Sequence, residues 1–251
     1  MQVFVLFATI TGIILTYAAQ FGFFAVDPGQ VSDTFFEEVL IIPAGYAFSI
    51  WSLIYLGFGA FAVYQALPRN KNHPRLGKTR PWLAASLLLN PVWVLAFEGL
   101  YFIPSLIIIT IMLVLALIMH RTLEIGTRTP KDNSERFLHI PFSLYAAWLT
   151  TATILEISGV LAVYTWNGFG LTDLTWAVII LLAVFALGLL FRLYLYDAVF
   201  GAVFVWAFVA IAVESDILLI EILAFVAAVA IAVSLPSPFA VKLREKLLPS
   251  S

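Results

Sequence analysis

An acidic residue lies deep in a long apolar stretch, where a charged side chain is costly. Glu156 follows a Thr-rich run at 150–153 in the hydrophobic stretch 140–164. A carboxyl group at that depth could bind, protonate or orient a ligand, and by default it suggests a functional site. The alternative is a structural acid that hydrogen-bonds a neighbouring helix. Because Lys and Arg lie only at the ends of the nearby apolar stretches, we expect a protonated Glu156 that bonds Asn90 or a Thr hydroxyl.

Deep aromatic side chains are the second source of chemistry. Trp51, Trp93 and Trp148 lie further inside their apolar stretches than an interfacial belt of tryptophans requires. Trp51 and Tyr55 are four residues apart, as are Trp93 and Phe97, so each pair lies on one face of a helix. Such faces could line a pocket for a flat apolar ligand, or they could be ordinary helix packing.

Other chemistries have little material in this chain. It has three histidines and no cysteine, which excludes disulfides and thiolate sites. His73, His120 and His139 all fall in or beside connections that carry Lys and Arg, so we expect no metal or haem-iron ligation. No glycine-rich nucleotide motif and no basic patch for nucleic acid is present. An intramembrane enzyme stays open as an alternative, but a lone acid without a histidine partner argues against it.

The composition requires a membrane. Of the 251 residues, 63% are hydrophobic and only 11% are charged, with a mean hydropathy of +1.03. A soluble domain is near half apolar and a quarter charged. The chain is therefore expected to be a multi-span integral membrane protein whose main partner is the lipid bilayer.

Eight apolar stretches are long enough, or nearly so, to cross a hydrocarbon core of about 30 Å as helices. They run over residues 3–25, 44–67, 81–97, 104–121, 140–164, 174–191, 198–213 and 217–235. We therefore predict an all-α polytopic transmembrane bundle of eight spans. In the loop 26–42, acidic residues alternate with apolar ones, which predicts a short amphipathic segment lying on the bundle.

The basic residues support this count. All 13 Lys and Arg fall in the second, fourth and sixth connections or after the last span, and the opposite connections contain acidic residues without any basic one. Basic residues favour the cytoplasmic side of a membrane. We therefore expect both termini in the cytoplasm and location in the cell membrane (plasma or inner). Without the short seventh span, the C-terminal basic cluster would lie outside.

Three motifs, in order along the first five spans, resemble the tryptophan-rich sensory protein family, also called the translocator protein or peripheral benzodiazepine receptor family (TspO). The second span contains PAGYAFSIWSLIY at 43–55, the third contains LNPVWVLAF at 89–97, and the fifth contains SLYAAW at 143–148 followed by ATILE at 152–156. One departure is Glu156, which stands where the family has Asn.

The resemblance implies a five-helix domain over residues 1–165, with a pocket capped by the loop between the first two helices. Residues 166–251 would then add an extension of about three helices. In the family, the pocket takes tetrapyrroles such as protoporphyrin and haem, sterols and benzodiazepine-like compounds. Carried over by position, it would involve Ala47, Phe48, Trp51, Asn90, Trp93, Trp148, Ala152 and Leu155. Phe97 and Glu156 complete the predicted site, and Tyr101 falls where the family tends to place another pocket aromatic.

The predicted function is a membrane receptor or sensor for a flat apolar molecule such as a porphyrin or haem, with no cofactor required. Two alternatives stay open. The first is a transporter of such a ligand, with Glu156 as a proton-coupled group. The second is an accessory subunit that packs against a larger membrane complex through the added spans. A homodimer is also expected from the resemblance, whereas the family's sterol signature is missing because no Lys or Arg follows Tyr164 in the run 164–167.

Overall fold

A computed structural model describes residues 1–18, 28–127, 133–194 and 197–234, which form helices joined by turns and short loops. The long helices are α1 (Gln2–Ala18), α3 (Ile50–Ala66), α4 (Pro74–Glu98), α5 (Phe102–Thr122), α6 (Asn133–Val163), α7 (Asp173–Tyr194), α8 (Ala198–Glu214) and α9 (Leu218–Ser234). The shorter pieces are α2 (Pro28–Phe35) and the 3-10 turns η2 (Gly45–Ser49), η3 (Pro68–Asn70) and η4 (Gly168–Gly170). The predicted all-α membrane bundle is confirmed.

Each of the eight predicted apolar stretches overlaps one long helix. Five helices are long and apolar enough to cross a membrane: Gly45–Ala66, Pro74–Glu98, Phe102–Thr122, Glu135–Val163 and Asp173–Arg192. The other three, α1, α8 and α9, are equally apolar but have 17 described residues each, about 25 Å of helix. Residues 19–25 of the first predicted span lie outside the described residues.

Two helices begin earlier than the apolar stretches predict. The spans expected from residues 81 and 140 belong to helices that start at Pro74 and Asn133. The apolar pattern marks only the part embedded in lipid, whereas the helices continue into the charged connections. There the Arg75 guanidinium contacts the Glu135 carboxylate at 3.0 Å, which joins the beginnings of α4 and α6.

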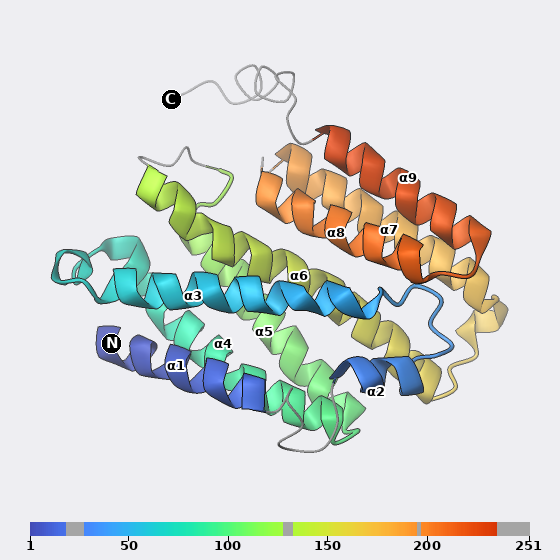
Figure 1. The fold of residues 1–251 in the computed structure, drawn as a ribbon, viewed down its shortest axis with the longest axis horizontal. Helices are drawn as coiled ribbons and strands as arrows, with labels where there is room; N and C mark the ends of the chain where they lie inside the picture. Colours follow the sequence, from blue (N-terminus) through green and yellow to red (C-terminus); the bar gives the residue numbers. More distant parts are fainter. Residues whose placement is uncertain (19–27, 128–132, 195–196, 235–251) are drawn as a thin grey trace.

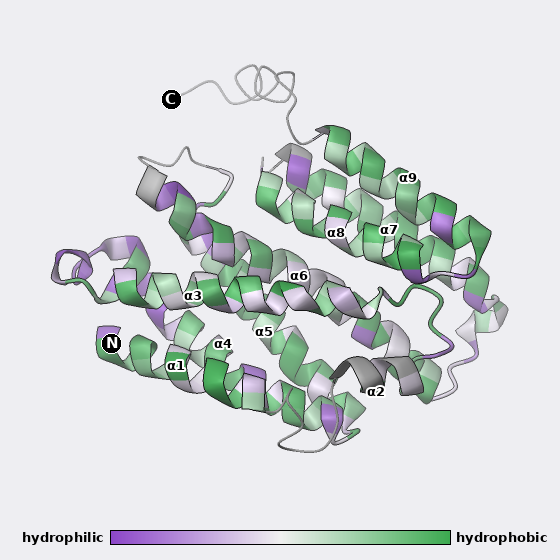
Figure 2. Cartoon of the chain, viewed as in Figure 1, coloured by the Kyte–Doolittle hydropathy of each residue, from purple (hydrophilic) through white to green (hydrophobic). Residues whose placement is uncertain are grey.

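The helices form one bundle (Figure 1). α1 packs on α3 and α4, α5 lies against α4 and α6, and α8 packs on α6 while α7, α8 and α9 pack on one another. One hydrophobic cluster contains residues of all eight long helices, from Val5 on α1 to Ile231 on α9, and a smaller one joins Val31 and Phe36 to residues of α4, α5 and α6. Figure 2 shows hydrophobic residues along the helices and hydrophilic ones mainly near their ends. The larger cluster thus combines residues from both sides of residue 165. The division of the chain at that residue stays a prediction.

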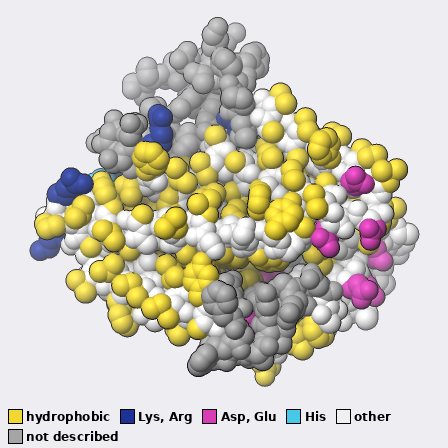
Figure 3. All heavy atoms as spheres, viewed as in Figure 1, with side chains coloured by type: hydrophobic (Ala, Val, Ile, Leu, Met, Phe, Trp, Pro, Cys, Tyr) yellow, Lys and Arg dark blue, Asp and Glu magenta, His cyan; other side chains and the backbone are white. Residues whose placement is uncertain are grey.

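Charged side chains separate toward opposite ends of the bundle. In Figure 3, Lys and Arg gather at the end that contains the α3–α4 connection, and Asp and Glu gather at the other end. His120 at the end of α5 bonds Asp197 in the α7–α8 connection, so these connections share the basic end. The bundle thus has the charge asymmetry that the eight-span prediction needs, and which end faces the cytoplasm stays a prediction.

The predicted amphipathic segment between the first two spans is present as α2. It packs on α4 and α6, with Val31, Ser32 and the following Phe36 buried. This helix covers the place where the candidate site lies.

Candidate ligand-binding site

Glu156 lies on α6 with only 3% of its surface exposed. Its Oε2 accepts a hydrogen bond from the Trp93 indole N–H on α4, with Nε1 and Oε2 3.0 Å apart. Its Oε1 accepts a hydrogen bond from the Ser105 hydroxyl on α5. One buried carboxyl group therefore joins three helices at the level of the deep tryptophans.

The predicted partners of Glu156 were wrong. The Asn90 Oδ1 instead accepts hydrogen bonds from the hydroxyls of Thr16 (3.0 Å) and Tyr55 (2.8 Å). The Thr153 hydroxyl has no hydrogen-bond partner among the described residues. Trp93 is one turn further along α4 than Asn90, and it is this turn that faces Glu156. Which side chains bond Glu156 depends on how α4 and α5 are rotated about their axes. Residue spacing within one helix does not predict this rotation.

The three deep tryptophans point into the bundle, as predicted. Trp51, Trp93 and Trp148 are 3%, 6% and 1% exposed. The Trp51 and Trp93 ring centroids are 6.0 Å apart, and Trp93 stacks on Phe97 at 5.7 Å. Phe48 meets Trp148 edge to face at 5.9 Å. Both i, i+4 pairs therefore lie on inward faces, and the interfacial belt does not include them.

These side chains surround a small cavity of about 40 Å³, called the aromatic cavity below. Its lining residues are Ser32, Phe36, Ile42, Pro43, Phe48, Trp51, Trp93, Phe97, Trp148, Ala152, Leu155 and Glu156. Eight of the ten predicted site residues are among them. Ala47 and Asn90 are buried behind the lining, and Tyr101 is 66% exposed and away from it.

The cap of the cavity comes from α2 and the residues after it, in the connection where the family resemblance implied a cap. The residues that form it, Ser32, Phe36, Ile42 and Pro43, were not among the predicted site residues. The Phe36 ring packs on Phe97 and Phe102 at centroid distances of 5.7 and 5.5 Å. On α6, Gly159 leaves room for this ring, because a Cβ at that position would overlap it. The alternation of apolar and acidic residues predicted a segment lying on the bundle, but it did not show which ring enters the site.

One buried polar group of the lining has no hydrogen-bond partner among the residues that the structure describes. The Trp148 indole N–H is buried without a hydrogen-bond acceptor among the described residues. A buried donor in that state costs about 1–3 kcal/mol, and a ligand with an acceptor atom would remove this cost. Together with Glu156 and Ser32, it gives a mainly apolar cavity a few points for polar recognition.

The described residues offer no group of three or more His, Asp or Glu side chains that could hold a metal ion. The described part of the site presents flat apolar faces with a polar edge.

The end of the site next to Pro43 is covered by α8. The Ala44 backbone N–H donates to the Ala210 carbonyl at 3.1 Å, and the Trp206 indole N–H donates to the Ala47 carbonyl at 3.1 Å. Tyr46 and Trp206 meet edge to face at 5.1 Å. The C-terminal helices thus support the segment that leads into Phe48.

Comparisons with known proteins place most of the chain in one family. The model of the family described as TSPO-like protein matches residues 2–236. The match continues beyond residue 165 and includes the three C-terminal helices. No curated protein and no solved structure matches the chain.

Proposed function

The chain belongs to the TSPO-like protein family, and from this premise we propose that it is a receptor or sensor for a flat apolar ligand that binds in the aromatic cavity. The family and the five long apolar helices make it a multi-pass integral membrane protein. The ligand class that we propose is a tetrapyrrole such as a porphyrin or haem. The observation that carries this proposal is the convergence of Trp51, Trp93 and Trp148 around one cavity with Glu156 at its edge.

The arrangement suits a flat ring with polar substituents. Aromatic pairs add about 0.5–1.5 kcal/mol beyond the area that they bury, so the faces of Trp51 and Trp93 would favour an aromatic ligand over an aliphatic one. A substituent that accepts a hydrogen bond can pair with the Trp148 N–H, and one that donates can pair with Glu156.

The cavity must enlarge to take such a ligand. It has about 40 Å³, whereas small-molecule sites commonly have about 300–1,000 Å³. The cap is the part best suited to move, because α2 is short and the Phe36 ring enters from outside the bundle. We therefore propose that the ligand displaces Phe36 and that α2 moves outward on binding.

A titration tests the proposal. Full-length protein in detergent is titrated with protoporphyrin, and binding is followed by tryptophan quenching and porphyrin absorbance. Trp51→Leu and Trp148→Leu should each weaken binding by about 0.5–1.5 kcal/mol beyond the loss of area. Trp82→Leu is the matched control, because Trp82 is 41% exposed and lies outside the cavity. If Trp51→Leu and Trp148→Leu bind protoporphyrin as tightly as the Trp82→Leu control does, the aromatic cavity is not the binding site.

Reconstituted protein separates a receptor from a carrier. If the protein binds porphyrin but does not move it across a proteoliposome membrane, it is a receptor. Flux that depends on the protein and is lost in Glu156→Gln would instead support the transporter.

A further inference from the structure

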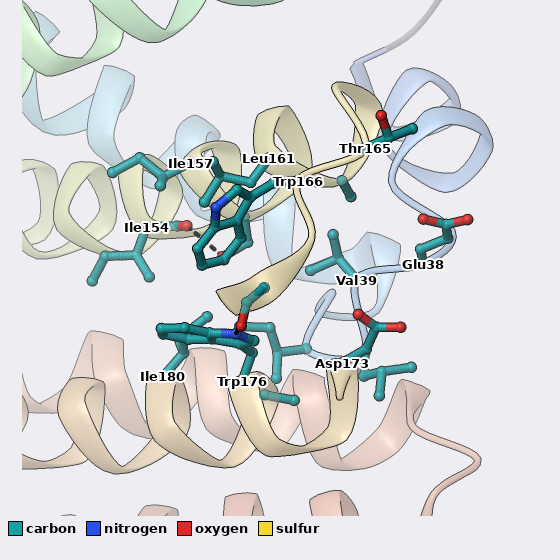
Figure 4. A pocket seen from close by; sticks show the side chains of 16 residues that line it. Glu38, Val39, Ile154, Ile157, Leu161, Thr165, Trp166, Asp173, Trp176 and Ile180 are labelled. Atoms are coloured by element: carbon teal, nitrogen blue, oxygen red, sulfur yellow. Dashed lines mark hydrogen bonds between the residues drawn. The ribbon is translucent and has the colours of Figure 1, made fainter. Parts of the chain in front are cut away.

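A second cavity lies between the end of α6 and the beginning of α7 and shares no lining residue with the aromatic cavity. It has a volume of about 300 Å³, which reaches the lower end of the range for small-molecule sites. Its walls come from residues 38–41, the last turns of α6, the turn that contains η4, and the first turns of α7 (Figure 4). It is called the α6–α7 cavity below.

The α6–α7 cavity is acidic at one end and apolar at the other. Figure 4 shows the carboxylates of Glu38 and Asp173 on one side and Ile154 and Ile180 on the other, with Trp166 between them. Neither carboxylate forms an ion pair with a described residue, and the lining contains no Lys, Arg or His. The charge of this end is therefore available to a ligand.

Two indole rings lie close together in the wall. The Trp166 and Trp176 centroids are 5.0 Å apart with an angle of 52° between the rings. The Trp176 indole N–H donates to the Gly168 carbonyl at 2.8 Å, which fixes the orientation of that ring. Gly168 has φ +60°, and a Cβ there would press on the Trp176 ring at 3.0 Å. Indole faces attract cations, and they attract them more strongly than other aromatic faces do.

The apolar end continues between the helices. Ile41, Ile154 and Ile180 also line a narrow space of about 10 Å³, with Phe208 and Ile211 of α8 on its far side. α7 packs mainly on α8 and α9, and α6 packs on α8, so the boundary between α6 and α7 is the open one. A linear hydrocarbon chain could follow this boundary.

We propose that the α6–α7 cavity binds an amphiphile with an ammonium head group and an apolar tail. The head lies between the two carboxylates and the indole faces, and the tail runs along Ile154 and Ile180. An anionic head would meet Glu38 and Asp173 without any basic residue in the lining. A neutral amphiphile would gain the apolar contacts but neither the charge attraction nor the cation–π contact.

The test uses full-length protein in maltoside micelles, whose heads are uncharged. The probe is a dodecyltrimethylammonium with a nitroxide quencher in its chain, and tryptophan fluorescence is followed against its mole fraction in the micelle. Neutral and anionic amphiphiles with the same chain and label are the comparison. The Trp166→Phe/Trp176→Phe variant defines the signal from the other tryptophans. We expect the cationic probe to half-saturate at an about tenfold lower mole fraction than the neutral one.

Matched variants isolate the carboxylates. Glu38→Gln/Asp173→Asn should remove most of the preference for the cationic probe, whereas Glu214→Gln/Asp216→Asn should keep it. Glu214 ends α8 and Asp216 lies in the α8–α9 connection; both are exposed and lie outside the cavity. The proposal is overturned if the neutral probe binds as tightly as the cationic one, or if both double variants keep the preference. None of these residues lines the aromatic cavity, so the porphyrin titration tests that cavity separately.

Discussion

At the scale of single residues, the aromatic cavity depends on how Glu156 is satisfied. A carboxyl group far from water needs hydrogen-bond partners, and here the donors are the Trp93 N–H and the Ser105 hydroxyl. Trp93 therefore has two roles: its ring faces the cavity and its N–H fixes the carboxyl at the polar edge. A substitution that keeps the ring but removes the N–H separates these roles.

We predict that Trp93→Phe destabilises the protein by about 1–3 kcal/mol, because it leaves one oxygen of a buried carboxyl group without its donor. Thermal unfolding in detergent measures this effect. Trp82→Phe, on an exposed part of the same helix, should change stability by less than about 0.5 kcal/mol. Glu156→Gln provides the second comparison, because an amide oxygen can still accept from the indole. If Trp93→Phe is as stable as the Trp82 variant, the hydrogen bond has no structural role.

Residue types and spacing, together with positions carried over from the family resemblance, predicted much of this site. The i, i+4 pairs placed Trp51 and Trp93 on the correct faces, because helical periodicity is a property of one segment. The partners of Glu156 and the entry of Phe36 depend on how separate segments meet. Spacing within a segment contains no information about that, so both had to come from the structure.

At the scale of elements, the contact between α1 and α4 depends on a glycine and a proline. Pro91 lacks an N–H, so the Leu87 carbonyl four residues earlier loses its usual donor within α4. Gly12 of α1 lies directly against this carbonyl, and a Cβ at that position would overlap it. The two helices can therefore approach closely only because position 12 has no side chain.

We predict that Gly12→Ala separates α1 from α4 and costs about 1–3 kcal/mol, the usual effect of overfilling a packed contact. Gly59→Ala is the matched control, because Gly59 is inside α3 with open space around the position of a Cβ. There the change should stabilise the protein by about 0.5–1 kcal/mol through the higher helix propensity of Ala. Unfolding temperatures that shift in the same direction for both variants would contradict the close contact.

The C-terminal helices are joined to α5 by a buried ionisable pair. The His120 Nε2 and the Asp197 Oδ2 are 2.8 Å apart, and the Asp197 Oδ1 accepts from the backbone N–H groups of Val199 and Phe200 at the beginning of α8. Burial raises the pKa of Asp197. The hydrogen bond and charge of His120 and the N–H of Phe200 outweigh burial, so this pKa lies below its ordinary value of 3.8.

A lowered pKa means that the folded state favours the carboxylate. The resulting stabilisation is complete above pH 3.8 and is lost as the pH falls through the folded-state pKa. We predict that Asp197→Asn costs about 1.5–3 kcal/mol near neutral pH, because a hydrogen bond to a charged group is lost. Between about pH 5 and pH 3 its unfolding temperature should fall less than that of the wild type, because only the wild type loses this stabilisation. Asp216 is exposed in the α8–α9 connection, so the unfolding temperature of Asp216→Asn should follow that of the wild type. If the unfolding temperatures of the wild type and of both variants fall equally with pH, the pair does not have this role.

At the scale of the whole molecule, charge divides the bundle into two ends, and this division tests the topology. The chain has no cysteine, so single cysteines can be introduced as labels. Three exposed residues lie between the spans at the two ends: Thr34 on α2, Lys71 after η3 and Asp216 after α8.

We predict that Thr34→Cys and Asp216→Cys react with a membrane-impermeant maleimide added to intact cells. Lys71→Cys should react only after the membrane is opened, because the basic connections favour the cytoplasm. If Asp216→Cys instead reacts together with Lys71→Cys, the count of eight spans is wrong. If Lys71→Cys reacts in intact cells and the other two variants react only after the membrane is opened, the count of eight spans holds and the orientation is inverted.

The fold was more predictable than its internal organisation. Apolar runs predicted every long helix, because membrane spanning requires them. They placed the starts of α4 and α6 too late, since a helix can continue into water beyond its apolar part. The large hydrophobic cluster from Val5 to Ile231 was not predictable, because the motifs that resemble the family covered only the first five spans and gave no contact for the rest.

The bonds from Ala44 and Trp206 have a consequence for biogenesis. Synthesis proceeds from the N-terminus, so the segment 44–48 enters the membrane long before α8 is made. Until α8 arrives, the Ala44 N–H lacks its acceptor and finds no substitute in hydrocarbon. The Ala47 carbonyl already accepts from the Ile50 N–H and gains the Trp206 indole N–H only later. The rim of the aromatic cavity is therefore completed only when the second-last helix inserts. A nascent chain whose synthesis stops before residue 198 would contain every lining residue of the aromatic cavity. Its cavity would not yet have the shape that it has in the complete protein.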